Sequence, residues 1–203
     1  MRLSGVVGEV NRVGIDLDLT LINSTEATRL ALTEVNAMFD GRIDIEEFMK
    51  RLGPPLRSEL ARYLPEHDLD RAIDVFRHDF LTRGVTYLTP MPGARDLLEQ
   101  VHRHGGIVVV ITSRILPVAE AALAACGLAP DMVIGGVAGR DKAKSMRKHD
   151  LDVYIGDHPL DMIGAIAADV CAVGVTSGTH DRAALQDAGA QVVHRSLTAL
   201  LDG

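Results

Sequence analysis

The sequence is poor in aromatic residues and in cysteine. It has no Trp, and aromatic side chains make up 3% of its 203 residues, so Leu, Val, Ile and Ala must fill the core. The two cysteines, Cys126 and Cys171, lie in apolar surroundings without the spacing of metal ligands. Cysteines in such settings are typical of reduced core residues in a reducing compartment.

Long apolar runs and clusters of basic residues are also missing. No run approaches the roughly 18–20 residues that a membrane helix needs, and the N-terminus lacks a signal pattern. The net charge of -7, with no Lys/Arg run, argues against a nucleic-acid or anionic membrane surface. We therefore expect a cytoplasmic protein, a monomer or homodimer, that binds neither nucleic acid nor membrane.

The pattern of apolar residues divides the chain into two kinds of segment. From residue 89 onward, short β-branched runs alternate with helical stretches, and Ile107–Ile111 is a continuous run of the kind buried on both faces of a sheet. This alternation predicts an α/β fold, a Rossmann-like parallel sheet with helices on both faces. The first strand is expected at Arg12–Leu17.

An all-helical segment separates that first strand from the rest of the predicted sheet. A plain strand-helix-strand crossover takes about 30 residues, and this chain spends far more between its first strand and Ile107. We therefore predict a helical cap at residues 23–88, without strands, inserted into a core domain made of residues 1–22 and 89–203. A cap that leaves the core beside an active site can exclude water from it.

Polar residues follow several of the predicted strands. Asp16 and Asp18 come directly after an apolar run, and they share a face if the chain stays extended. Because the carboxyl ends of parallel strands meet at one edge of the sheet, we expect the polar residues there to lie close together. The others at this edge are Thr112, Ser113, Lys142, Asp157 and Asp161.

These residue types suit the handling of a phosphoryl group. Asp16, Asp157 and a phosphate oxygen are ligands of the kind that Mg²⁺ prefers. Lys142 would offset phosphate charge as a compact cation, and Thr112 would donate a hydrogen bond to the phosphate. Together these residues indicate a site that handles a phosphoryl group.

Four motifs in the chain resemble those of a known family. They are Asp16-Leu17-Asp18-Leu19-Thr20, Thr112, Lys142 and Gly156-Asp157-His158-Pro159-Leu160-Asp161. In this order they match the motifs of the haloacid dehalogenase (HAD)-like hydrolase superfamily. The segments Met91–Leu98 and Leu52–Leu56 are similar to parts of its phosphoglycolate-phosphatase-like branch, which carries a helical cap of the C1 type. Two positions depart from the common pattern, because Leu19 replaces a usual Gly and Asn23 a common Asp.

The resemblance implies a role for each matched residue. Asp16 would attack phosphorus and form an aspartyl-phosphate, and Asp18 would act as general acid and base. Mg²⁺ would be bound by Asp16, the backbone carbonyl of Asp18 and Asp157, with Asp161 holding metal-bound water or Lys142. Thr112, with Ser113 as its neighbour, and Lys142 would bind the substrate phosphate.

Some assignments require a choice between neighbours. Lys142 and Lys144 lie two apart on a helix and cannot both face the site, and the family pattern favours Lys142. Arg57, which follows the Gly-Pro-Pro break, is the first candidate for substrate specificity in the cap. His158 is interpreted as a wall of the pocket rather than a chemical participant, and Arg114 as a residue that could face the cap.

The leading hypothesis is a Mg²⁺-dependent phosphatase of a small phosphorylated metabolite, a phosphoric monoester hydrolase that, as the resemblance implies, acts through an aspartyl-phosphate. The alternative is a phosphomutase that uses the same intermediate and returns the phosphoryl group to a sugar phosphate. A catalytically idle binding or regulatory module is disfavoured, because all four motifs are intact.

Overall fold

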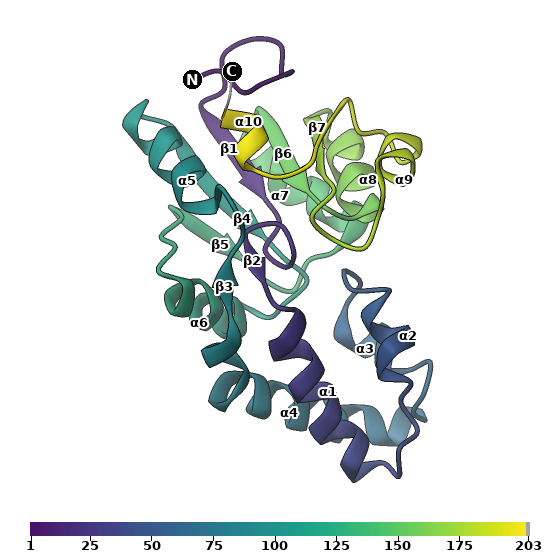
Figure 1. Cartoon of the computed structure of the whole chain (residues 1–203). Helices are drawn as coiled ribbons and strands as arrows, with labels where there is room; N and C mark the ends of the chain where they lie inside the picture. The colour runs from purple at the N-terminus through teal and green to yellow at the C-terminus, as the bar shows by residue number, and fades with distance from the viewer. Residues whose placement is uncertain (202–203) are drawn as a thin grey trace.

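A six-stranded parallel sheet forms the centre of the computed structural model, which describes residues 1–201. Its strand order is β5-β4-β1-β6-β7-β8 (Figure 1). The central strands are apolar and buried on both faces, which is characteristic of parallel sheets. The strands are β1 (Arg12–Ile15), β4 (Ile107–Ile111), β5 (Met132–Ile134), β6 (Val153–Gly156), β7 (Cys171–Val175) and β8 (Val192–His194).

Helices cover both faces of the sheet, and each face has its own apolar core. Alternate residues of β4 point to opposite faces, so Val108 and Val110 belong to one core and Val109 and Ile111 to the other. One face packs against α5 (Ala94–Arg103), α6 (Leu116–Cys126) and α10 (Thr198–Leu201), and the other against α7 (Lys142–Lys148), α8 (Pro159–Ala168) and α9 (Arg182–Asp187). The predicted α/β fold is confirmed.

The helical insertion is present and lies beyond the carboxyl ends of the strands (Figure 1). It consists of α1 (Thr25–Met38), α2 (Ile45–Met49), α3 (Leu56–Leu60), α4 (Glu66–Thr82) and the short 3-10 helix η1 (Gly84–Tyr87). Its interior is apolar and includes the buried side chains of Val35, Leu60 and Phe76. The exact bounds of the two units, 1–22 with 89–203 and 23–88, remain a prediction.

A small second sheet joins the insertion to the core. It pairs β2 (Ile22–Asn23) with β3 (Thr89–Pro90) in antiparallel fashion. Only Asn23 of this pair falls within the predicted cap, and the sequence did not predict the pair, because strands of two residues carry no readable alternation. Within the described residues no helix is long and apolar enough to cross a membrane.

Strand register brings the predicted polar residues to one edge of the sheet. Ile15 of β1 lies opposite Val110 of β4 and Ile155 of β6. The carboxyl ends of the three strands therefore lie at nearly the same level along the strand direction. As a result, the residues that follow them, Asp16, Thr112 and Asp157, face the same space beneath the insertion.

Candidate active site

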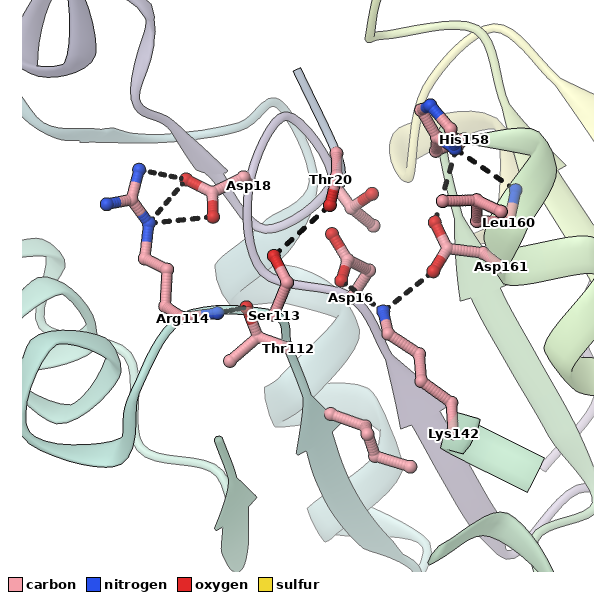
Figure 2. A network of polar contacts seen from close by, with 12 residues as sticks. Asp16, Asp18, Thr20, Thr112, Ser113, Arg114, Lys142, His158, Leu160 and Asp161 are labelled. Carbon is pink, nitrogen blue, oxygen red and sulfur yellow. Dashed lines mark hydrogen bonds and ion pairs between the residues drawn. The ribbon is translucent and has the colours of Figure 1, made fainter. Parts of the chain in front are cut away.

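Asp16 and Asp18 follow β1 but turn to different partners. The chain leaves the extended conformation after Asp16 and bends at Leu19, whose φ of +58° lies in the left-handed region. The Asp16 carboxylate contacts Lys142, whereas the Asp18 carboxylate points away from it toward Arg114 (Figure 2). Both acids line the same cavity. Because the loop directs them to different partners, the two neighbouring acids have separate environments.

Lys142 lies at the centre of a buried polar cluster. Its side chain is 3% exposed, and its Nζ donates to Asp16 Oδ1 at 2.6 Å and to Asp161 Oδ1 at 2.7 Å. A third donation goes to the Tyr154 hydroxyl at 2.8 Å, which in turn donates to the Ile111 carbonyl at 2.7 Å. Three fixed acceptors hold the ammonium in one place. Lys144, by contrast, is exposed, in line with the choice of Lys142 from the sequence.

Burial and crowding of like charges set the electrostatics of this cluster. Burial raises the pKa of Asp16 to about 7, with the attraction of Lys142 opposing the rise. Burial, and then the charges of Asp16 and Asp161, raise the pKa of Asp157 well above its usual range. Burial alone would lower the pKa of Lys142, but Asp16 and Asp161 raise it well above its usual value. The site therefore contains more buried carboxyl groups than one lysine could balance if all of them were ionised.

Three of these acids are close enough to share a cation. Oxygen atoms of Asp16, Asp157 and Asp161 lie within 4.8 Å of one another, and all three residues are buried. Such oxygen donors, with a deficit of positive charge, fit a hard divalent metal ion. The Asp18 carboxylate is not in this group, so the predicted contact of Asp18 with the metal rests on its backbone carbonyl.

The surrounding backbone is shaped to the Asp157 carboxylate. Thr20 donates its hydroxyl to Asp157 Oδ1 at 2.7 Å. On the other side the backbone of Gly178 approaches so closely that a Cβ there would lie 1.8 Å from Asp157 Oδ2. Gly156 is similar, because a Cβ would lie 2.4 Å from Asp161 Oδ2. Only glycine allows the chain to pass this near to the acids.

Asp18 is held by residues from both the core and the insertion. Arg114 donates to both Asp18 oxygens through Nε, at 2.8 Å and 3.0 Å, and through Nη2 at 2.8 Å. Ser24, at the start of α1, donates its hydroxyl to Asp18 Oδ1 at 2.5 Å instead of capping the helix. The guanidinium of Arg114 also stacks 4.0 Å from the ring centre of Phe80 on α4. Arg114 therefore does face the cap, and it links Asp18 to the insertion.

The two hydroxyl residues after β4 are placed differently. Thr112 is buried, and its Oγ1 accepts a hydrogen bond from the backbone of Arg114 at 3.2 Å. Ser113 Oγ donates to the carbonyl of Gly53 in the cap loop at 3.1 Å. Gly53 has a φ of +139°, and a Cβ there would lie 2.5 Å from the ring of His158. Ser113 thus touches the cap, and its predicted phosphate contact remains a prediction.

His158 caps a core helix and packs beside the cap loop, and its interpretation as a wall of the pocket stays a prediction. Its Nδ1 accepts from the Leu160 backbone at 3.0 Å and caps α8, and its ring packs edge-on against His180 at 4.3 Å between centres. Burial lowers the pKa of His158 to about 4. The imidazole is therefore neutral near pH 7 and serves as packing surface between core and cap loop.

A cavity of about 260 Å³ lies between the insertion and the core. Asp16 and Asp18 line its core side, and arginines with apolar residues line its cap side. Arg57 is among the lining residues, but its guanidinium is half-exposed and paired with Glu66 at 2.7 Å and with Asp70. Its role in specificity stays a prediction.

The sequence interpretation missed three residues of this region. Tyr154 belongs to none of the sequence motifs, although its hydroxyl orients Lys142. Thr20 was quoted within the first motif without the contact to Asp157 that it makes. Arg77 on α4 lines the cavity and was not singled out, because one arginine on an amphipathic helix resembles any solvated residue. The spacing of residues along a cap helix does not indicate which of its polar side chains lie against the core domain.

The known proteins that this chain resembles have the names of phosphatases or of a pyrophosphatase. The chain is 22% identical to the pyrophosphatase PpaX of Halalkalibacterium halodurans, over 96% of each chain. It is 26% identical to a phosphoglycolate phosphatase of Aquifex aeolicus, over 64% of this chain and 62% of that protein. Among solved structures, a predicted phosphatase from Clostridium acetobutylicum superposes with a TM-score of 0.84 at 28% identity, over 95% of this chain and 97% of that one.

The family model described as haloacid dehalogenase-like hydrolase matches residues 15–175. The match begins at the last residue of β1, just before Asp16, and ends with β7. It therefore includes the whole insertion and every residue of the buried cluster. The protein belongs to the haloacid dehalogenase-like hydrolases and is a phosphatase of that family.

Proposed function

We propose that the protein is a Mg²⁺-dependent phosphatase that hydrolyses monoesters of a small phosphorylated metabolite through an aspartyl-phosphate on Asp16. One observation carries the proposal. Asp16 lies in a buried cluster with Lys142 and two further acids, and it opens toward a cavity that the separately held Asp18 also lines. This arrangement offers a nucleophile and an acid in different environments.

In the first step, an oxygen of the Asp16 carboxylate attacks the substrate phosphorus. The bond between phosphorus and the ester oxygen breaks, and that oxygen takes a proton from Asp18 as it leaves. Lys142 keeps Asp16 oriented through its 2.6 Å contact and supplies positive charge beside the incoming phosphoryl group. The products of this step are the free alcohol, the aspartyl-phosphate and an ionised Asp18.

In the second step, a water molecule attacks the phosphorus of the aspartyl-phosphate. Asp18 takes the proton from this water, the bond between phosphorus and Asp16 breaks, and inorganic phosphate leaves. Asp18 returns to its protonated form and Asp16 to its carboxylate, so the cycle closes without another reactant. Arg114 contacts both oxygens of Asp18 and so keeps this side chain in one position between the two steps.

The donor set supports Mg²⁺ as the metal. Asp16, Asp157 and the backbone carbonyl of Asp18 would hold it, with Asp161 beside them and binding Lys142. All of these donors are oxygen atoms, which favours a hard cation over zinc or copper. When bound, the ion would reduce the repulsion between a carboxylate and a phosphate dianion.

The relatives favour hydrolysis over the mutase alternative. Their names describe a pyrophosphatase and a phosphoglycolate phosphatase, both of which transfer the phosphoryl group to water. A mutase would in addition have to shield the aspartyl-phosphate from water and return it to a sugar phosphate. No contact among the described residues favours that outcome.

Hydrolysis of an aryl phosphate by purified protein tests the proposal. We expect activity with Mg²⁺, none in excess chelator, and none for Asp16→Asn. Asp96→Asn, at an exposed position of α5, is the matched control and should keep the activity. Full activity of Asp16→Asn, or undiminished turnover in chelator, would contradict the mechanism.

A further inference from the structure

Four arginines line the cavity between insertion and core, and three of them are already paired with carboxylates. Arg114 binds Asp18. Arg51 binds Glu59 at 2.9 Å and also Glu47. Arg57 binds Glu66 and Asp70. The charge of each of these guanidinium groups is therefore balanced within the protein.

Arg77 is the exception among residues 1–201. It lines the cavity from α4, it is half-buried, and it makes no ion pair and no side-chain hydrogen bond with any described residue. The lining of the same cavity is largely apolar and includes Phe48, Phe76 and Val118. A guanidinium beside such a wall is partly removed from water without receiving a counter-charge, which is unfavourable unless a ligand supplies one.

The geometry points to Arg77 as a residue that binds an anionic group on the leaving group. The preferred substrates then carry a second negative charge, a carboxylate or a further phosphate, in addition to the phosphoryl group that is transferred. This inference rests on the proposed phosphatase function and names its substrate class. The phosphoryl group would lie against Asp16 and Lys142 on the core side, and the second anion would reach Arg77 on the cap side.

The dimensions of the cavity limit what can lie between these two ends. Its volume of about 260 Å³ is below the roughly 300–1,000 Å³ of sites that enclose drug-sized ligands. Its lining is largely apolar and offers little to a polyhydroxylated chain or a nucleobase. A short leaving group with a terminal anion satisfies the size, the apolar wall and the unpaired arginine together.

Paired substrates test this directly. Phosphoglycolate and 2-hydroxyethyl phosphate have leaving groups of similar size, but only the first carries a carboxylate, and pyrophosphate supplies the phosphate alternative. The measured quantity is the ratio of kcat/KM for the charged substrate to kcat/KM for 2-hydroxyethyl phosphate. Because both values come from one preparation, any unfolded fraction cancels from the ratio.

We expect wild-type protein to prefer a charged substrate. Arg77→Gln should lower the ratio of kcat/KM values roughly 10- to 100-fold, because this is the effect of losing a hydrogen bond to a charged group. A preference for phosphoglycolate would identify a carboxylate as the anion, and a preference for pyrophosphate a phosphate. Arg71→Gln, at an exposed position of the same helix, should leave the ratio unchanged.

An unchanged ratio in Arg77→Gln, or a wild-type ratio near one, overturns the inference while the phosphatase function stands. An equal fall in the ratio for Arg71→Gln also overturns it, since general loss of positive charge from the cap would then be the cause. If wild-type protein hydrolyses none of these three substrates, nor an aryl phosphate, the proposed function itself fails and the inference with it.

Discussion

Replacing Lys142 with methionine removes the one ammonium that balances the buried acids. Methionine keeps the length and most of the volume of the side chain. It leaves Asp16 and Asp161 without the donor that now lies 2.6 Å and 2.7 Å from them. Lys144→Met is the matched control, because Lys144 is on the same helix but exposed.

The expected loss of stability depends on pH. Removing one partner from a buried ion pair costs roughly 3–5 kcal/mol of the free energy of unfolding, and we expect a loss of this size at pH 8. The pKa of Asp16 is already raised to about 7 with the lysine present, and it will rise further without it. A carboxyl whose pKa is raised on folding stabilises the folded state at low pH and destabilises it as pH increases through that pKa. The deficit should therefore shrink at pH 5, where Asp16 is protonated.

Urea unfolding of the metal-free protein at the two pH values measures this deficit, and aryl phosphate hydrolysis measures the function. We expect Lys142→Met to lose at least roughly 100-fold in kcat, as when one preorganised donor is removed from an active site. Lys144→Met should match wild type in both assays. A deficit below about 1 kcal/mol at pH 8, or one that grows as the pH falls, would refute the assigned charge balance.

Two further predictions concern the metal. Gly178→Ala places a Cβ against Asp157 Oδ2, so it should raise the Mg²⁺ concentration needed for half-maximal activity. Gly8→Ala, with open space around it, should not raise that concentration. The same Mg²⁺ concentration for half-maximal activity in both variants would contradict the close fit of Gly178 to Asp157. Mg²⁺ should raise the Tm of chelator-treated protein, and more at pH 8 than at pH 5, because burial raises the pKa of Asp16 and protons then compete for the site. A larger rise at pH 5, seen by scanning calorimetry, would argue against a site built on Asp16.

The sequence contained enough information for the sheet and for most of the buried cluster. Continuous β-branched runs such as Ile107–Ile111 mark doubly covered strands, and the polar residues that follow them meet wherever parallel strands end together. Asp16, Asp157, Asp161 and Lys142 were placed together in this way, and the structure brings them into one cluster.

The contacts between insertion and core could not be predicted in the same way. Which residue of α1 or α4 reaches Asp18 depends on how two elements distant in sequence pack, and periodicity describes only the element itself. Ser24 looks like a helix cap in the sequence, yet its hydroxyl goes to Asp18. Leu19 was noted as replacing a usual glycine, and its positive φ shows that the bend is kept with a residue that tolerates it poorly.

The central claim is that the phosphoryl group is carried by Asp16, and mass spectrometry of Asp18→Asn tests it most directly. An aryl leaving group departs without protonation, so this variant can be phosphorylated by an aryl phosphate but lacks the base that activates water. We predict that protein quenched in acid after mixing with an aryl phosphate and Mg²⁺ carries one phosphoryl group, located on the peptide with Asp16. A phosphoryl group on another residue, or wild-type rates of phosphate release by Asp18→Asn with no modified Asp16, would contradict the account.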